Sequence, residues 1–357
     1  MSDVDTDAAF AALGGWPGVL GRLLSGRDLG ADEAGAALGE ILSGAATHAQ
    51  VAAFIVALRM KGETVQEMTG LVQAMLAHAE PLAVPGDLVD TCGTGGDRSR
   101  SVNVSTMAAL VVAGAGARVC KHGGRAASSS AGSADVLEAL GVVIDLGPAG
   151  VARCIEDAGI GFCFAPRFHP AMRHAVPVRS ELGVATVFNF LGPLANPARA
   201  RFQVVGVSDP AMADTMLGVL MANGSRRAMV VHGADGLDEL STTGPSAVIE
   251  AGEDGTVHRY TVTPEELGLA PVALEALRGG DAAENAEVVR RVLAGDQGPH
   301  RDVAVRNAAA GLVVAGISPD LAAGVERAAQ VIDAGGAHEA LQRLVRTSQA
   351  ARHDAAS

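Results

Sequence analysis

The chain has 357 residues, of which 48% are hydrophobic, 19% charged and only 3% aromatic, and it carries a formal net charge of −13 at pH 7. This length exceeds what one hydrophobic core usually serves, so a globular protein with a main domain and a smaller domain is expected. The negative charge repels a phosphate backbone at long range and therefore disfavours nucleic acid as a partner.

The N-terminal sequence MSDVDTDAAF is acidic, whereas a signal peptide begins with basic residues. The longest apolar stretches, such as Ala108 to Ala117, are too short to span a bilayer. The four cysteines have neither the density of a disulfide framework nor CxxC spacing. We therefore expect a cytoplasmic protein with reduced thiols, no structural zinc and no membrane partner.

The first 80 residues show helical periodicity. Between Val51 and Leu58 the apolar side chains follow i, i+3, i+4, i+7 spacing, and a second series runs from Val65 to Met75. Pro81 and Pro85 then interrupt the pattern. The sequence therefore predicts a small N-terminal all-α domain over residues 1–82.

From about residue 86, short β-like runs alternate with helical stretches rich in Ala and Leu. This alternation predicts a larger α/β domain over residues 83–165 and 196–357. Its mostly parallel central sheet should be flanked by helices, with ligands at the carboxyl ends of the strands. The strands are expected at Leu88–Cys92, Arg118–Cys120, Val142–Ile144, Gly161–Ala165, Phe202–Val207 and Ala228–His232.

Two further segments interrupt or follow this alternation. Residues 166–197 are rich in Pro and Arg, and residues 166–195 are expected to pack on the N-terminal helices. After about residue 281 the pattern predicts three helices, around Val288, over Ala304–Ala315 and over Leu321–Ile332. The tail beyond Arg346 is expected to be frayed.

The first candidate site is a glycine-rich loop in LVDTCGTGGDRSRSVNVST, residues 88–106, which leads from a strand into a helix. Glycines let a backbone approach a bulky anion, and the start of a helix offers free N–H groups to phosphate. Asn103, Ser105 and Thr106 are natural N-cap and first-turn residues. An ordinary capped turn has the same pattern, which is neither a Walker A nor a GxGxxG sequence.

A second loop, KHGGRAASSSAGS at residues 121–133, follows the next expected strand. Lys121 and Arg125 supply positive charge, and the serines supply hydroxyl groups. Two such loops at one edge of a sheet predict a ligand with two separated phosphoryl groups. A solvated basic turn is the alternative.

Adjacent carboxylates follow the last expected strand, in HGADGLDEL at residues 232–240. Asp238 and Glu239 suit a hard cation bound largely through water, as Mg²⁺ prefers. A solvated acidic loop is the alternative. A fold that placed Asp97, Lys121 and Glu239 on unrelated faces would contradict a common site.

Taken in order, these motifs resemble those of the anthranilate phosphoribosyltransferase family. The resemblance covers most of the chain and implies transfer of a phosphoribosyl group from phosphoribosyl pyrophosphate (PRPP) to the amine of anthranilate, in tryptophan biosynthesis. It also implies Mg²⁺ as cofactor and a homodimer formed through the N-terminal helices. The matching segments are ALRMKGET at residues 57–64, DTCGTGGD, NVST, KHGGRAASS, AGSADVLEALG, HPAMRHAVPVRSELG, FNFLGPLANP, VVHGADGLDEL and RNAAAGLVVAG at residues 306–316.

The resemblance implies roles for individual residues. Ser105, Asp238 and Glu239 correspond to Mg²⁺ ligands, and Gly93, Gly124 and Arg179 to the anthranilate site. The implied PRPP site comprises Gly93, Gly96, Asp97, Ser101, Asn103, Val104, Ser105, Thr106, Lys121, His122, Gly123, Gly124, Arg125, Ala126, Ala127, Ser128, Ser129 and Ser133.

Three histidines are candidates for chemistry. His122 is a possible general base, but an amine as weakly basic as that of anthranilate needs little deprotonation before it attacks. A positioning or substrate-lining role is therefore favoured for His122, and a structural role is the alternative. His169 and His174 have no third metal ligand nearby in the sequence, so structural or pocket-lining roles are favoured for them.

One position departs from the family pattern. The second loop normally reads KHGNR, and its asparagine helps to bind anthranilate, whereas this chain has Gly124. The missing hydrogen bond costs on the order of 1 kcal/mol where water replaces it. The alternatives are a phosphoribosyltransferase for another aromatic amine, a pyrimidine-nucleoside phosphorylase, against which the acidic pair and Arg179 argue, and a non-catalytic relative that binds nucleic acid.

Overall fold

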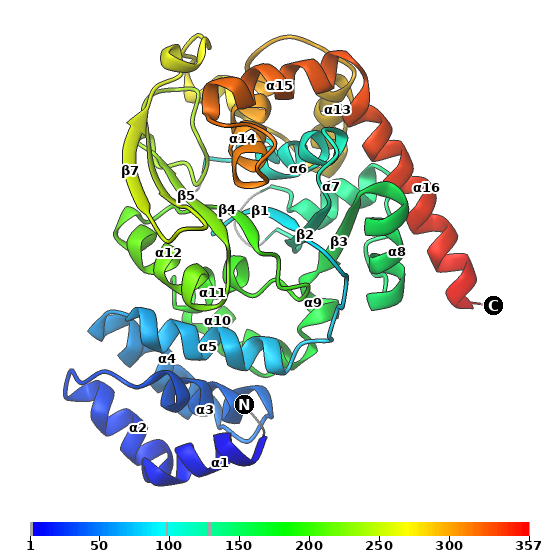
Figure 1. Ribbon diagram of the computed structural model, residues 1–357. Coiled ribbons are helices and arrows are strands. Elements are labelled where there is room, and N and C mark those ends of the chain that lie inside the picture. Colours follow the sequence, from blue (N-terminus) through cyan, green and yellow to red (C-terminus); the bar gives the residue numbers. More distant parts are fainter. Residues whose placement is uncertain (1–2, 98, 127–129, 357) are drawn as a thin grey trace.

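The computed structural model describes residues 3–97, 99–126 and 130–356, and the chain begins with five helices that form a bundle at one end of the molecule (Figure 1). Capping boxes start the last two of these helices. The Thr47 and Thr64 hydroxyls accept N–H bonds from Gln50 and Glu67, whose side chains accept the Thr47 and Thr64 N–H groups in return. The helices are α1 (Asp3–Ala12), α2 (Gly15–Leu24), α3 (Ala31–Leu42), α4 (His48–Lys61) and α5 (Val65–Ala77).

A seven-stranded sheet forms the centre of the remaining chain, in the order β3-β2-β1-β4-β5-β6-β7. The neighbours β3, β2, β1, β4 and β5 all run parallel to one another. Strand β6 runs antiparallel to β5, and β7 runs antiparallel to β6. The register pairs the last residues of β1 and β4, Gly93 and Gly206. The strands are β1 (Val89–Gly93), β2 (Val119–Gly123), β3 (Ile160–Phe164), β4 (Phe202–Gly206), β5 (Arg227–Gly233), β6 (Ser246–Ala251) and β7 (Val257–Val262).

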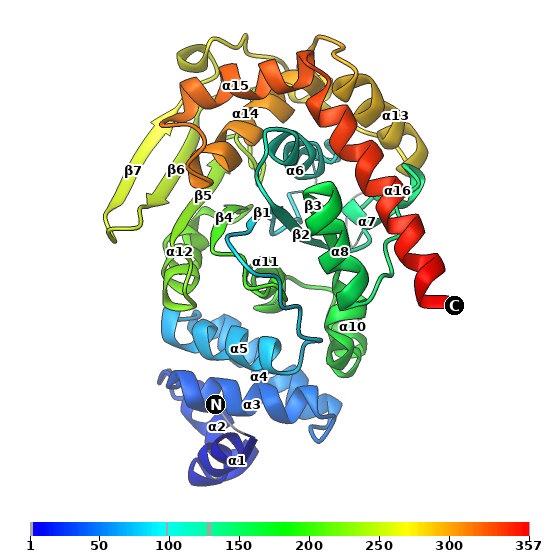
Figure 2. The same ribbon diagram turned by 45° about the vertical axis from the view of Figure 1, so that its right-hand side comes forward.

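Helices cover both faces of this sheet, as Figure 2 shows. One face carries most of the long helices, and the other faces the N-terminal bundle. The arrangement confirms the expected fold, a small all-α domain followed by an α/β domain with a mostly parallel sheet. The covering helices are α6 (Val104–Gly114), α7 (Ser133–Ala139), α8 (Pro148–Ala158), α12 (Ala213–Ala222), α13 (Ala282–Leu293), α14 (Pro299–Val314), α15 (Leu321–Asp333) and α16 (Gly336–Ala356).

The central strands are buried on two sides. Along β5, Met229 and Val231 belong to one hydrophobic cluster, whereas Ala228 and Val230 belong to a second cluster on the opposite face. The first cluster includes α6, α14 and α15, and the second includes α12 and the helical bundle. Burial on both faces explains why these strands read as continuous apolar runs in the sequence.

Residues 165–194 form short helices that depart from the α/β alternation. They are α9 (Ala165–Phe168), the 3-10 helix η1 (Pro170–His174), α10 (Val176–Leu182) and α11 (Phe188–Leu194). Here η1 contacts α3, α10 contacts α4 and α11 contacts α5. The same hydrophobic cluster joins this segment, the bundle and one face of the sheet. Because that cluster is continuous, the domain limits proposed from the sequence stay predictions.

The predicted strand at Val142–Ile144 is wrong. Val142 and Ile144 are buried as strand residues would be, but the Val143 N–H donates to the Ser348 hydroxyl at 3.0 Å instead of to a neighbouring strand. The sequence prediction also lacks β6 and β7. Most of β7 is exposed on both of its faces, so no burial pattern marks it as a strand.

The expected frayed tail beyond Arg346 is also wrong. A fourth C-terminal helix, α16, continues to Ala356 and packs on α8 and α6 (Figure 1). Ser348 and Leu344 on its inner face are buried. Polar and charged residues separate these inner positions along the sequence, which hides the helix from a search for apolar runs.

The cysteines and the helices bear on the expected location. Cys92, Cys120, Cys154 and Cys163 are all free and buried, in keeping with the expected reduced thiols. None of the helices in the described ranges combines the length and the apolar character that crossing a membrane requires.

The first prediction concerns α16. Ser348→Ala removes the acceptor of the part-buried Val143 N–H and, with it, one hydrogen bond, which costs about 1 kcal/mol of unfolding free energy. Chemical denaturation measures the loss. Arg346→Ala, on the exposed side of the same helix, is the control and should change stability by less than about 0.5 kcal/mol. Equal stability of the two variants would contradict the assigned packing.

Candidate active site

A cleft lies where the winding direction of the sheet reverses. After β1 the chain continues to β2 and β3 on one side, and it then returns to β4 on the other side of β1. The loops after β1 and β4 therefore leave the sheet in opposite directions, which opens a crevice at the carboxyl ends of the strands. A cavity of about 430 Å³ occupies this edge, and both glycine-rich loops, Arg179 and the acidic pair line it.

The first glycine-rich loop, which follows β1, is held by two later loops. The Gly95 N–H donates to the Asp238 carboxylate at 2.6 Å. The Thr94 hydroxyl accepts the Ser208 N–H at 3.1 Å, and the Ser208 hydroxyl donates to the Gly95 carbonyl at 3.0 Å. The shape of this loop therefore depends on the loops after β4 and β5.

Asn103 does not use its side chain as the predicted N-cap of α6. Its Nδ2 donates to the Ala131 carbonyl at 3.0 Å, and its Oδ1 accepts from Asn285 at 3.0 Å. At the start of α6, interaction with the backbone of Ser105 opposes the rise of the Glu239 pKa. Asn103 is therefore the N-cap residue of α6, as expected, but its side chain makes no capping bond and instead ties the first loop to the second.

Lys121 brings a buried positive charge to the start of α6. It lies on β2, and its Nζ donates to the Thr91 carbonyl at 2.7 Å and to the Ser105 hydroxyl at 3.3 Å. A cation at this turn would attract an anionic ligand bound by the first loop.

A buried carboxylate on the neighbouring strand β1 holds the end of β2. Asp90 on β1 accepts the His122 N–H at 3.2 Å and the Asn196 side-chain amide at 2.8 Å. The same Asn196 amide donates to the Cys120 carbonyl at 2.8 Å. Burial raises the pKa of Asp90, and the attraction of Lys121 opposes that rise. The network fixes the point from which the second loop leaves the sheet.

Arg125 is engaged by its own loop and by α7. Its Nη1 donates to Asp135 at 2.7 Å and to Glu138 at 2.9 Å, and its guanidinium lies 5.7 Å from the centroid of the Phe164 ring. Two carboxylates therefore balance its charge. Its expected contact with PRPP stays a prediction.

The acidic loop between β5 and β6 crosses the ends of two neighbouring strands. A methyl group at Gly206 would overlap the Asp238 carbonyl oxygen, and one at Gly93 would overlap the Asp238 carboxylate. Glycine at both positions therefore lets Asp238 and Glu239 reach the cleft from a strand two places away from β1 in the sheet.

The carboxylates of this loop repel one another. Burial, followed by repulsion from Asp97, raises the pKa of Asp238 to about 7. Burial and repulsion from Asp238 raise the pKa of Glu239, although Lys121 opposes the rise. A divalent cation would relieve this repulsion.

The protein supplies only part of a metal-binding shell. Within residues 3–97, 99–126 and 130–356, no group of three or more His, Cys, Asp or Glu side chains is arranged to hold a metal ion. Mg²⁺ commonly keeps several waters and binds through one or two carboxylates plus the phosphates of a substrate. An incomplete set of ligands therefore fits a cation that binds together with a phosphorylated substrate. Ser105, Asp238 and Glu239 stay its predicted ligands.

Two of the histidines place a ring nitrogen against a backbone carbonyl oxygen. His122 Nδ1 lies 3.1 Å from the Gly192 carbonyl oxygen, and His169 Nε2 lies 3.0 Å from that of Ala195. Burial, followed by the nearby His169, lowers the pKa of His122 to about 3. Such a ring is a poor general base near neutral pH, which favours the lining role. His174 does not line the cleft.

Arg179, on α10, supplies a cation from the side of the helical bundle. Its guanidinium lies 5.2 Å from the centroid of the Phe188 ring. Burial lowers the pKa of Arg179, and no carboxylate of the described chain lies within ion-pair distance of it. A cation in a cleft without an acidic partner suits a ligand that carries a carboxylate.

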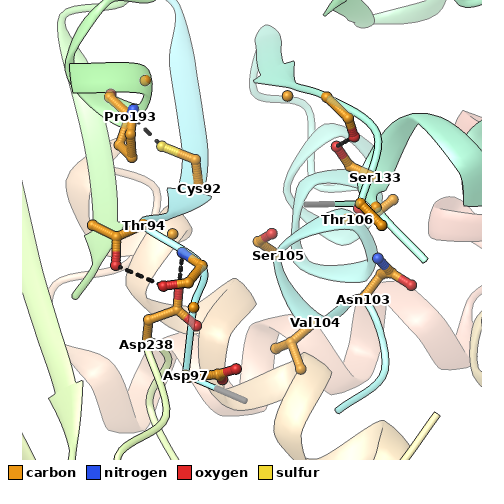
Figure 3. Close-up of a pocket in the computed structure, with 18 of the residues that line it drawn as sticks. Cys92, Thr94, Asp97, Asn103, Val104, Ser105, Thr106, Ser133, Pro193 and Asp238 are labelled. Carbon is orange, nitrogen blue, oxygen red and sulfur yellow. Dashed lines mark hydrogen bonds between the residues drawn. The ribbon is translucent and has the colours of Figure 1, made fainter. Parts of the chain in front are cut away.

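All predicted site residues that the structure describes line this one cleft, including Asp97, Lys121 and Glu239. In Figure 3, Asp97, Thr94 and Asp238 lie on one side of the cleft and Asn103, Thr106 and Ser133 on the other. The condition set for a common site is therefore met. Three predicted PRPP contacts lie outside the described residues: Ala127, Ser128 and Ser129.

Sequence reasoning missed one wall of the cleft. Phe188, Asn189, Gly192 and Pro193 line it from α11. The available signal was FNFLGPLANP, because a proline inside a helix removes a backbone hydrogen bond and indicates a special local need.

Comparison with known proteins begins with the family. Residues 17–79 match the helical bundle domain of a glycosyl transferase family, and residues 85–338 match its a/b domain. The chain is 56% identical over 337 residues to an anthranilate phosphoribosyltransferase from a Nocardioides species, with 92% of this chain and 98% of that protein covered. The chain belongs to the anthranilate phosphoribosyltransferase family. Its counterpart from Thermomicrobium roseum is 54% identical over 330 residues, with 91% and 95% covered.

Solved structures of the anthranilate phosphoribosyltransferase family have the same fold. The crystal structure of the Thermus thermophilus protein superposes with a TM-score of 0.88 at 44% identity, and the match covers 93% of this chain and 99% of that one. The Saccharomyces cerevisiae protein, solved in complex with PRPP and Mg, superposes with a TM-score of 0.86 at 28% identity, with 94% and 98% covered. These findings confirm the family to which the motifs pointed.

The second prediction concerns the repulsion within the acidic loop. Because the folded state raises the pKa of Asp238 to about 7, folding favours its proton, and stability falls as the pH rises from about 4 through 7. Asp238→Asn removes this ionisation and keeps an oxygen that can accept the Gly95 N–H. Without metal, the variant should melt a few degrees above the wild type at pH 8 and above it by a clearly smaller margin at pH 5. A lower melting temperature at pH 8 would contradict the assigned repulsion.

Proposed function

We propose that this protein transfers the 5-phosphoribosyl group of PRPP to the amine of anthranilate and releases pyrophosphate. The observation that carries the proposal is the meeting of two glycine-rich loops, an acidic pair and Arg179 in one cleft. Family relatives at 56% and 54% identity that are named for this activity support it. They favour anthranilate over another aromatic amine, and an enzyme over a nucleic-acid-binding relative.

PRPP is assigned to the wall formed by the loops after β1 and β2. The Thr106 hydroxyl, buried at the start of α6, has no hydrogen-bond partner among the described residues, and Lys121 lies at the same turn. An anionic ligand would use both groups. The Saccharomyces cerevisiae relative in complex with PRPP and Mg supports this substrate.

Mg²⁺ is proposed as the cofactor on the acidic side of the cleft, held by Asp238, Glu239 and Ser105. The donor set fits a hard cation because it consists of two carboxylates and a hydroxyl, all oxygen donors. The negative charge of the two carboxylates lacks a full counterion in the protein. When bound, Mg²⁺ would stabilise negative charge on the departing pyrophosphate.

Anthranilate is assigned to the wall formed by α10 and α11. Arg179 is proposed to pair with its carboxylate, because this cation has no acidic partner of its own in the described chain. Gly124, where a side chain would meet only the Ala165 Cβ, leaves room for the aromatic ring, and Gly93 lines the same cleft. The Saccharomyces cerevisiae relative in complex with 4-fluoroanthranilate supports an acceptor of this kind.

The reaction asks for positioning and charge stabilisation more than for proton transfer. The amine nitrogen attacks C1 of the ribose, the C1–O bond to pyrophosphate breaks with its electron pair on the oxygen, and the nitrogen then loses its proton to water or to the released pyrophosphate. Lys121 and the loop amides stabilise the phosphates, while Arg179 aligns the amine. His122, whose burial lowers its pKa to about 3, is not needed as a base.

The assembly and location follow the same proposal. A homodimer through the N-terminal helices would cover apolar side chains that this bundle exposes, such as Leu24 on α2 and Met60 on α4. A cytoplasmic location agrees with four free, buried thiols.

The third prediction tests the acidic pair. Asp238→Asn with Glu239→Gln should lower PRPP-dependent turnover of anthranilate by at least about a hundredfold, because it removes the charge that would hold Mg²⁺. Loss of anthranilate fluorescence measures the reaction. Glu253→Gln with Asp254→Asn is a matched control, an adjacent acidic pair in the turn between β6 and β7 outside the cleft. Full activity of the first double variant would remove its carboxylates from the mechanism.

The fourth prediction tests Gly124. A side chain here would meet only the Ala165 Cβ at 4.0 Å, so Gly124→Asn should fold normally. The amide it adds should lower KM for anthranilate by about fivefold, the equivalent of one hydrogen bond. Gly244→Asn, also in open space but outside the cleft, is the control. A higher KM for anthranilate in Gly124→Asn would indicate that the native glycine serves a bulkier acceptor.

A further inference from the structure

A buried side chain of α14 hydrogen-bonds the backbone of the acidic loop on the side away from the cleft. Asn307 is 3% exposed and does not line the cleft. Its Oδ1 accepts the Leu240 N–H at 2.8 Å, and its Nδ2 donates to the Leu240 carbonyl at 2.9 Å. The same Nδ2 donates to the Val303 carbonyl within α14 at 2.9 Å. Both backbone polar groups of Leu240 therefore depend on one amide side chain.

The preceding residue of α14 holds the next part of the same loop. Arg306 is completely buried, and its guanidinium donates to the Ser241 carbonyl and, at 2.8 Å, to the Val262 carbonyl at the end of β7. It makes no ion pair with a carboxylate of the described chain. Burying a guanidinium that bonds only to backbone carbonyls costs desolvation free energy. The presence of such an arginine here indicates that this loop must be held in one place.

The loop is held on its opposite side as well. Asp238 rests on Gly206 and accepts the Gly95 N–H at 2.6 Å. Leu240 directly follows Glu239, and consecutive Cα atoms are joined at a fixed distance of about 3.8 Å. A displacement of Leu240 would therefore move Glu239 and Asp238 relative to the first glycine-rich loop.

We propose that Asn307 is a positioning residue for the acidic pair: its amide fixes the Leu240 backbone and so places Asp238 and Glu239 over the ends of β4 and β1. The consequence for catalysis rests on the proposed function, in which this pair holds the cation that accompanies PRPP. The role differs from that of an ordinary core side chain, because its loss should change the use of metal and PRPP and not stability alone. The motif RNAAAGLVVAG then has a function although it contributes no ligand.

The experiment compares wild type, Asn307→Ala and Ser348→Ala. The last is a matched control because Ser348 is also a buried polar side chain that bonds a loop backbone, and it lies outside the cleft. Both variants should melt below the wild type. Only Asn307→Ala should raise the Mg²⁺ concentration for half-maximal activity and the KM for PRPP, each by about tenfold, with KM for anthranilate changed by less than about twofold.

Asn307→Asp keeps the shape of the side chain and provides a second variant to test if Asn307→Ala does not fold. It retains an acceptor for the Leu240 N–H but sets carboxylate oxygens against the Leu240 and Val303 carbonyls. Its Mg²⁺ and PRPP dependence should shift in the same direction as that of Asn307→Ala. Unchanged dependence in the folded Asn307 variants, or an equal shift in Ser348→Ala, overturns the proposal.

Amide hydrogen exchange separates this proposal from the proposed function. Exchange over residues 237–242 should be faster in the Asn307 variants than in Ser348→Ala, whether or not the protein uses anthranilate. A wild type that binds Mg²⁺ and PRPP but does not transfer to anthranilate would refute the proposed acceptor and leave the positioning role intact. Unchanged exchange over this segment would refute the positioning role itself.

Discussion

The site depends on the packing of the acidic loop against two glycines at the ends of neighbouring parallel strands. Gly206 accommodates the Asp238 carbonyl, and Gly93 accommodates its carboxylate, which then accepts the Gly95 N–H. This contact brings a loop from β5 to the switch point beside β1, where the sheet opens. Without it, the carboxylates and the first glycine-rich loop would belong to separate parts of the sheet edge.

The helical bundle is connected to both walls of the cleft by Arg59 of α4. Its guanidinium donates to Asp209 at 3.1 Å and to Glu63 at 3.3 Å, and it lies 5.5 Å from the centroid of the Phe190 ring. Asp209 follows Ser208, which supports the first glycine-rich loop, and Phe190 belongs to α11, which lines the acceptor side. The motif ALRMKGET thus contributes to the site through contacts between layers and contains no ligand of its own.

Features that depend on local composition are predictable from the sequence. The strands of the parallel sheet read as apolar runs because both of their faces are buried, and the loops after β1, β2 and β5 stand out because glycine and charge follow such runs directly. The exposed strand β7 carries no burial pattern, and Val142–Ile144 is buried without pairing to a strand. Asn307 and Ser208 support the loops through contacts with residues far away in the sequence, which no local pattern reveals.

Gly206 lines no part of the cleft, yet the acidic loop occupies the space where its side chain would be. Its importance lies in atoms that it lacks. In a mutational survey scored by turnover, such a position would behave like a substrate contact, although backbone clearance sets which side chains it tolerates. The positions essential for turnover would therefore include residues that bind substrate and residues, such as Gly206, that only leave space for another segment of the chain.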